Sequence, residues 1–419
     1  MDLRKVEEVM ELPTEGRVVE KKEDMMENRE GKEQQVDSGY ALKSFLDHIP
    51  ITSIPNIPNS STVLEIKHDH CVLDAISLMH NNNVGGAIII DWCDFKKSVD
   101  RDIGFIEFSA MVLWCLEELD KVRAESKISD HGFLSVLEHT SSIAQTKIGE
   151  LAKLFLWEPF FPIHIHETLF HALLLFAKHN RLNVIPVVES SNSVVVGFVT
   201  QDAVLQLLLQ SSGLAWFDEI AEKSLLEFGF KHAGRVISAY SDQSLAETLH
   251  ILRENQINEV AVVDRKSGTM VGCVRSRDLY LLFEDDIIFS SRKALTAEEF
   301  INSRTQKGNQ RIKTSAETDV CRNALCLRND LLAGFTTPAT SQKSDSLKKA
   351  METLVASKSD CIFMVNESGH VEGVITIRDV ISVFSPPCMD SRINGGGFFN
   401  SALEQVGCRV ENGMMIQTS

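Results

Sequence analysis

The segment GVITIRDVISVF, residues 373–384, predicts a strand that opens with glycine and turns directly into a helix. Three earlier segments start in the same way: GFIEF from Gly104, GFVTQ from Gly197 and GCVRS from Gly272. Each is preceded by a short apolar run and, before that, by an amphipathic pattern. The chain therefore contains one structural unit four times, and such internal repetition decides the fold before any single motif does.

The amphipathic pattern before each strand pair is helical. Apolar or small residues recur three, four and seven positions after a fixed apolar start, which places them on one helix face. The four starting residues are Val72, Leu169, Leu245 and Leu347. The apolar runs that follow are 87–90, 185–188, 260–263 and 362–365. The order predicted for every copy is helix, strand, strand, helix, with Ala75, Ala172 and Ala350 buried.

One such unit is too small to bury both faces of its own sheet, so two units must cover each other. We therefore predict an α/β fold of two pseudo-two-fold pairs, the first copy with the second and the third with the fourth, forming a flattened disc. The cleft inside a pair would expose helix N-termini and backbone amides, which favour phosphate. An Asp in the first helical turn there could accept hydrogen bonds from both ribose hydroxyls.

The endings GCVRSRDLYLLF and GVITIRDVISVF resemble the end of a cystathionine-beta-synthase (CBS) repeat, whose strand-to-helix turn carries Thr or Ser followed three positions later by Asp. Four such repeats resemble the gamma subunit of AMP-activated and sucrose-non-fermenting-related protein kinases, and the segment 211–225 is closest to the plant gamma-like branch. The resemblance spans roughly residues 52–384. It implies two paired CBS units (Bateman modules), AMP, ADP or ATP as regulatory ligand, kinase catalytic alpha and beta subunits as partners, and a cytoplasmic location with the nucleus as a second one.

The repeats and the segments between them divide the chain. The ranges are a charged N-terminal extension 1–51, CBS repeat one 52–118, repeat two 148–210, a connector helix 211–232, repeat three 233–285, a partly disordered insertion 286–333, repeat four 334–385 and a mobile tail 386–419. Within the insertion, Thr296 and Glu299 fit a capping box, which predicts a helix over 296–302.

The resemblance places nucleotide contacts in the third and fourth repeats. The fourth repeat has Thr376 and Asp379 at the motif positions, with Arg378 between them. The third keeps Asp278 but has Arg275 in place of the hydroxyl residue. The first and second repeats match neither pattern in full, so we expect at most two competent sites, both in the second pair.

The phosphate position departs from the family pattern. Animal gamma subunits place basic residues just before the first strand of a repeat, and none of the corresponding pairs is basic here: Gly85-Gly86, Asn183-Val184, Asn258-Glu259 and Asp360-Cys361. An anion would have to rely on backbone amides and on Arg275, Arg277 or Arg378.

A structural role competes with ligand binding at each candidate. Thr376 and Asp379 also fit a capping box, and Asp278 alone suits a helix start without any ligand. The histidines of the second repeat lack a Cys or carboxylate at ligand spacing, which favours surface roles over a metal site. They are His164, His166, His171 and His179.

Composition narrows the class of protein. The formal net charge of −17 disfavours generic nucleic-acid binding. No apolar run is long enough to cross a bilayer. The 9 cysteines form no CxxC pair and indicate a reducing compartment. Outside the repeats no segment is large and apolar enough for an enzyme core.

Two functions follow from the residues and the resemblance. The favoured one is a non-catalytic regulatory, gamma-like subunit of a plant sucrose-non-fermenting-related kinase complex that senses adenine nucleotides. The alternative is a standalone CBS scaffold that binds another partner and no nucleotide.

Overall fold

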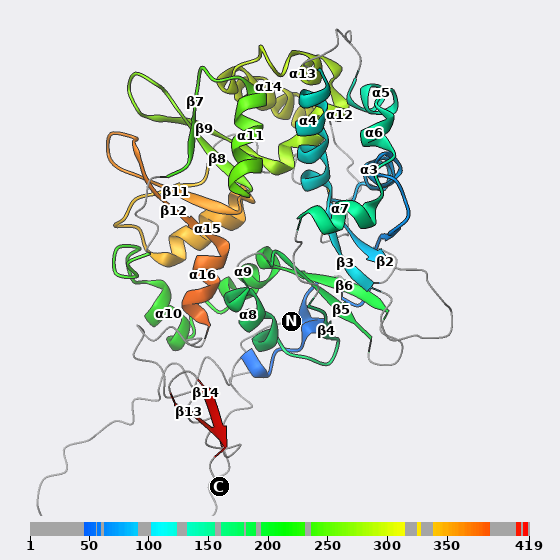
Figure 1. Ribbon diagram of the computed structural model, residues 1–419. Helices are drawn as coiled ribbons and strands as arrows, with labels where there is room; N and C mark the ends of the chain where they lie inside the picture. The colour runs from blue at the N-terminus through cyan, green and yellow to red at the C-terminus, as the bar shows by residue number, and fades with distance from the viewer. Residues whose placement is uncertain are drawn as a thin grey trace, which may run out of the picture.

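The computed structural model describes residues 46–55, 57–59, 63–90, 102–123, 132–155, 161–179, 182–189, 194–230, 236–314, 325–327, 338–385, 408–411 and 414–417. Four units of one design make up most of them (Figure 1). The first contains β1 Glu65–Lys67, α3 Val72–Asn81, β2 Gly86–Ile90, β3 Asp102–Glu107 and α4 Phe108–Arg123. The second contains β4 Ile163–His164, α8 Leu169–Lys178, β5 Val184–Val188, β6 Val195–Thr200 and α9 Gln201–Leu209.

The third and fourth repeats follow the same order. The third contains β7 Ser238–Tyr240, α11 Leu245–Asn255, β8 Glu259–Val263, β9 Met270–Arg275, a 3-10 turn η3 Ser276–Tyr280 and α12 Leu281–Glu284. The fourth contains β10 Thr340–Ser341, α15 Leu347–Ser357, β11 Cys361–Val365, β12 Val371–Thr376 and α16 Ile377–Phe384. The closing segment of the third repeat thus starts as a 3-10 turn, whereas α16 is helical from its first residue.

Each repeat has its own three-stranded sheet, and among the described residues no sheet is shared between repeats. In each, a short leading strand pairs parallel to the middle strand, and the last strand pairs antiparallel to it. The mixed α/β class and the repeated unit are confirmed. The leading strands β1, β4, β7 and β10 were not predicted, since two or three residues carry no readable alternation.

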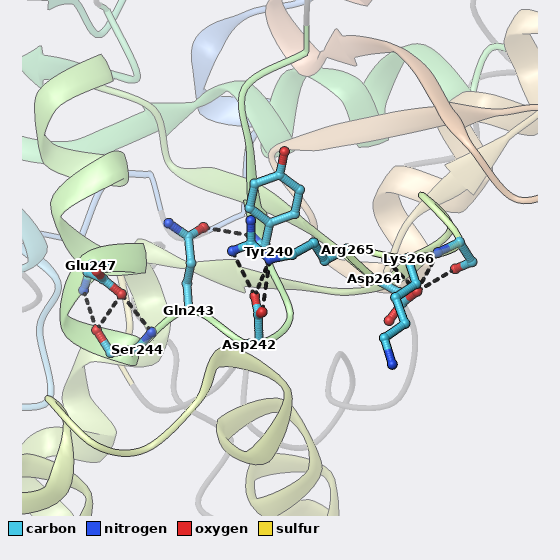
Figure 2. Close-up of polar contacts among 9 residues, drawn as sticks. Tyr240, Asp242, Gln243, Ser244, Glu247, Asp264, Arg265 and Lys266 are labelled. Atoms are coloured by element: carbon cyan, nitrogen blue, oxygen red, sulfur yellow. Dashed lines mark hydrogen bonds and ion pairs between the residues drawn. The ribbon is translucent and has the colours of Figure 1, made fainter.

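The predicted helix faces point into the core. Ala75, Ala172 and Ala350 are fully buried. Helix α11 shows how such a helix begins: the Ser244 hydroxyl accepts from the Glu247 backbone N–H (3.2 Å), and the Glu247 carboxylate accepts from Ser244 N (2.9 Å), which is a capping box (Figure 2).

Sheet faces join the first repeat to the second and the third to the fourth. One apolar cluster combines Ile88 and Phe105 of the first repeat with Val184 and Phe198 of the second. A smaller one combines Ala261 and Cys273 with Cys361 and Phe363. The predicted pairing is therefore present at the sheets.

Helices make the larger cores, and they join different repeats. One core combines α3 and α4 with α11 and α12, and so links the first repeat to the third. The other combines α8 and α9 with α15 and α16, and so links the second repeat to the fourth. Figure 1 shows the consequence: four repeats in a ring, each contacting one neighbour through sheets and the other through helices. These helical contacts between the pairs were not predicted from the sequence.

A polar cluster lies at the carboxyl ends of β7 and β8 (Figure 2). The Arg265 guanidinium donates to both carboxylate oxygens of Asp242 (2.8 to 3.1 Å) and lies over the Tyr240 ring, 3.9 Å from its centroid. This cluster is at the opposite end of the sheet from Arg275, which pairs with the first residue of β8.

Segments between the repeats also contribute helices. In the connector, α10 Ala215–Ala221 brings the buried Phe217 against Phe384, with stacked rings 5.5 Å apart. Helices α5 Phe133–Glu138, α6 Ser141–Ala144 and α7 Ile148–Phe155 pack on the core of the first and third repeats.

The insertion contains α13 Asp286–Ser291 and α14 Ala297–Thr314. The helix predicted from Thr296 and Glu299 is confirmed, because the Thr296 hydroxyl accepts from Glu299 N (3.2 Å) and the Glu299 carboxylate accepts from Thr296 N (2.9 Å). The predictions for most of the N-terminal extension, for much of the insertion after residue 314 and for most of the tail lie outside the described residues. Within the tail, β13 Cys408–Glu411 pairs antiparallel with β14 Met414–Gln417.

The described residues bear on two predictions made from composition, the oxidation state of the cysteines and the lack of a membrane-spanning segment. Cys71, Cys115, Cys273 and Cys361 are free thiols. Cys326 is disulfide-bonded, whereas the cysteine pattern of the sequence had indicated a reducing compartment. Of the helices in the described ranges, none has the length and apolar character needed to cross a membrane.

Candidate functional site

The strand-to-helix turns of the four repeats occupy equivalent places. In each sheet the last residue of the final strand lies opposite the first residue of the middle strand. These partners are Gly86 and Glu107, Val184 and Thr200, Glu259 and Arg275, and Cys361 and Thr376. The candidate residues of the third and fourth repeats therefore lie at the same end of their sheets.

In the fourth repeat, Thr376 and Asp379 form a complete capping box. Asp379 Oδ2 accepts from Thr376 N (2.8 Å) and from its hydroxyl (2.7 Å), and Thr376 Oγ1 accepts from Asp379 N (3.2 Å). The two residues therefore cap the start of α16. This capping does not exclude a ligand, because a carboxylate can accept about four hydrogen bonds.

Arg378 serves a contact between repeats. Its guanidinium donates to the carbonyls of Phe176 (3.2 Å) and Ala177 (3.1 Å), near the end of α8. A cation at a helix C-terminus is favourable because the last carbonyls carry partial negative charge. The structure therefore places Arg378 at the contact between the fourth repeat and the second.

In the third repeat, Arg275 and Asp278 are buried, with 4% and 5% of their surface exposed. Asp278 Oδ2 accepts from Arg275 N (3.0 Å) and forms an ion pair with Arg304 of α14. Burying such a carboxylate is tolerable only because a cation and a backbone N–H satisfy it. In the structure, Asp278 is therefore bound by the Arg275 backbone N–H and by Arg304.

A polar network that the sequence analysis missed links the third and fourth repeats. The Asp360 backbone N–H donates to Glu259 Oε1 (2.7 Å), and Arg277 Nη2 donates to Asp360 Oδ1 (2.9 Å). Both carboxylates belong to the residue pairs that the sequence analysis compared with the basic pairs of animal gamma subunits. The available signal was the acidic character of these two positions together with Arg277, whereas we had noted only that they were not basic.

Two glutamates in this region have a raised pKa. Burial, followed by the charge of Asp360, raises the pKa of Glu259 to about 7, against the lowering effect of Arg275 and Arg277. Within the described residues, Glu259 Oε2 is buried without a hydrogen-bond partner. Burial and Asp360 also raise the pKa of Glu107 in the first repeat, whose carboxylate accepts from the Asn183 amide at 3.5 Å. Residues of all four repeats thus meet in one polar region.

Glu259→Gln is expected to remove part of the pH dependence of stability. The pKa of Glu259 is higher in the folded state, about 7, than the ordinary 4.5 of an unfolded chain. Its contribution is therefore fully present below pH 4.5 and is lost as the pH rises through about 7, a loss of roughly 3 kcal/mol at most. Urea unfolding at pH 5 and pH 8 measures it.

The control for that prediction is Glu352→Gln, a change at an exposed glutamate of α15. The unfolding free energies at the two pH values should converge in Glu259→Gln and keep their wild-type difference in Glu352→Gln. An unaltered difference in Glu259→Gln would show that another group carries the pH dependence.

The remaining candidate ligands form no metal centre in the described part of the chain, where no group of three or more His, Cys, Asp or Glu could hold an ion. His171 Nδ1 instead lies 2.8 Å from Glu167 Oε2, four residues earlier and just before α8 begins.

Three of the four repeats match a known family of domains. A family model described as CBS domain matches residues 148–210, 233–285 and 336–386, which are the second, third and fourth repeats. The chain is 24% identical to the SNF1-related protein kinase regulatory subunit gamma-1 of Arabidopsis thaliana over 376 residues, covering 83% of this chain and 84% of that protein. It is 25% identical to the gamma-1-like subunit of the same plant, covering 83% and 88%.

A solved structure shows the same fold. It is a Methanocaldococcus jannaschii protein described as an archaeal homologue of gamma-AMPK, with a TM-score of 0.52 and 17% identity over 80% of this chain and all of that one. At this identity the likeness concerns the fold alone. The first repeat of the present chain has the same order of elements as the three that the family model matches.

Proposed function

The chain is a CBS-repeat, gamma-like protein, and from this premise we propose that it is the non-catalytic regulatory subunit of a plant sucrose-non-fermenting-related kinase complex. The observation that carries the proposal is the extent of the similarity, which covers 84% and 88% of the two plant gamma subunits. The four repeats account for most of the described chain, so the proposed role is one of binding and regulation.

The proposed partners are the catalytic alpha subunit and the beta subunit of such a kinase, in the cytoplasm and the nucleus. Affinity capture of the tagged chain from plant extract, followed by peptide identification, tests this. We expect both subunits in amounts comparable to those captured by a plant gamma subunit used as positive control. Their absence, when the control recovers them, would replace the proposal with the scaffold alternative.

We further propose that an adenine nucleotide binds at the turn formed by Thr376 and Asp379. Asp379 is in the first turn of α16, where a carboxylate can accept from ribose hydroxyls and the helix N-terminus favours phosphate. Both residues are only partly buried, in contrast to Arg275 and Asp278. These differences support the fourth repeat as the site.

One observation favours the scaffold alternative. Glu259 and Asp360 put two carboxylates near the turns of the third and fourth repeats, and Arg277 is held by Asp360. An incoming phosphate would meet this negative charge with one arginine already paired. A scaffold that binds a protein partner without a nucleotide would be compatible with such a network.

A further inference from the structure

Helix α14 is anchored to the third repeat at its start. The Ala297 backbone N–H donates to the Gln243 carbonyl (2.8 Å), and Leu245 N donates to the Leu295 carbonyl (2.8 Å). Ala297 and Phe300 are buried in the core that the first and third repeats share. Although it lies in the segment between two repeats, α14 is therefore a packed part of the third.

The same helix lies over β9. A Cβ built on Gly272 would come within 2.8 Å of Ile301 Cδ1, so glycine at this position permits the close approach of the helix. One turn further along, Arg304 is 3% exposed and its guanidinium pairs with the carboxylate of Asp278. Two contacts thus hold α14 against β9 and the turn that follows it in the third repeat.

Asp278 is the internal counterpart of Asp379. Each accepts from the backbone N–H of the residue three positions earlier, Arg275 N at 3.0 Å and Thr376 N at 2.8 Å. Arg275 and Thr376 in turn occupy the same register position in their sheets. At the turn of the third repeat, Arg304 of α14 covers this carboxylate, and both side chains are buried.

We infer that α14 is a built-in occupant of the nucleotide position of the third repeat, with Arg304 holding the carboxylate that a ribose would otherwise use. The inference rests on the proposed nucleotide role of Asp379 and deepens it, since it assigns the chain one adenine-nucleotide site in its second pair. A ligand at Asp278 would have to displace a buried guanidinium and leave it unpaired. Breaking a buried ion pair in this way would weaken binding by about two orders of magnitude or more.

The test is the number of AMP molecules bound per chain, measured by titration calorimetry. The variant combines Ile301→Ala with Arg304→Ala. These changes remove the contact of α14 with Gly272 and its ion pair with Asp278. We expect one site in the wild-type chain and a second site in the variant. The second site should persist when Asp379→Ala is added and disappear when Asp278→Asn is added.

Asn302→Ala, at an exposed position of the same helix, is the matched control and should keep the wild-type number of sites. A variant that melts cooperatively, as the wild type does, but binds no additional AMP would overturn the inference. An additional site in the variant, with no site at all in the wild type, would support the inference and refute the proposed role of Asp379.

Hydrogen exchange of the unmodified chain gives a second readout, in case the double variant does not fold. Saturating AMP should change the protection of amides in the first turn of α16 and leave α14 unchanged. Loss of protection in α14 on AMP addition would show that the nucleotide displaces the helix, and would overturn the inference. No change at either place would likewise count against the assignment of a nucleotide site to the second pair.

Discussion

Phe384→Ala should lower the free energy of unfolding by about 3 to 5 kcal/mol, the usual cost of removing a large aromatic side chain from a packed core. Phe384 ends α16 and is 0% exposed. Its ring stacks on Phe217 of the connector, within the core that joins the second repeat to the fourth. The cavity would therefore open where three segments of the chain meet. The midpoint and slope of urea unfolding measure the loss.

Ile287→Ala is the control for this change, because Ile287 is an apolar residue of α13 with 75% of its surface exposed. Its effect should stay within about 0.5 kcal/mol, as for most surface substitutions. If Phe384→Ala cost less than about 1 kcal/mol, the helical contact between the second and fourth repeats would not be a stabilising core.

Asp379→Ala should weaken AMP binding roughly tenfold or more. Hydrogen bonds from ribose hydroxyls to an ionised carboxylate contribute about 1.5 to 3 kcal/mol each, and 1.4 kcal/mol corresponds to a factor of ten in the dissociation constant. Titration calorimetry on the wild type and the variant gives the ratio. The same substitution removes the capping contacts to Thr376, so a lower melting temperature is also expected.

Asp379→Asn separates the two roles. The amide keeps the size of the side chain and one oxygen for capping, but it loses the charge that strengthens the bonds to ribose. AMP binding should therefore weaken while the melting temperature changes little. Asp242→Asn, at the opposite end of the third sheet, should alter neither. If both Asp379 variants bound AMP as the wild type does, and only Asp379→Ala melted earlier, capping would be the whole role of this residue.

The sequence was informative wherever a periodic pattern decided the structure. The helix faces marked by Ala75, Ala172 and Ala350 are buried as expected, because the spacing of apolar residues alone fixes which face turns inward. The capping box of Thr296 was equally readable, since all its members lie within four residues. Local spacing was sufficient in both cases.

The contacts between repeats could not be predicted from the same patterns. An apolar helix face does not specify which other helix will cover it, so the packing of the first repeat on the third gave no signal in the sequence. The polar network is non-local as well, because Glu259 and Asp360 are 101 positions apart and Arg277 and Asp360 are 83 apart. Arg304 pairs with Asp278 across 26 positions and from a segment that we had expected to be partly disordered.

The role as a regulatory subunit is tested most directly by the mass of the complex formed when this chain is co-expressed with the catalytic alpha and beta subunits of a plant sucrose-non-fermenting-related kinase. Light scattering after size-exclusion chromatography should show one species that contains all three chains, with a contribution of 46.8 kDa from this one. A plant gamma subunit expressed in its place is the positive control. Elution of this chain apart from the other two, under conditions in which the control assembles with them, would contradict the proposed role.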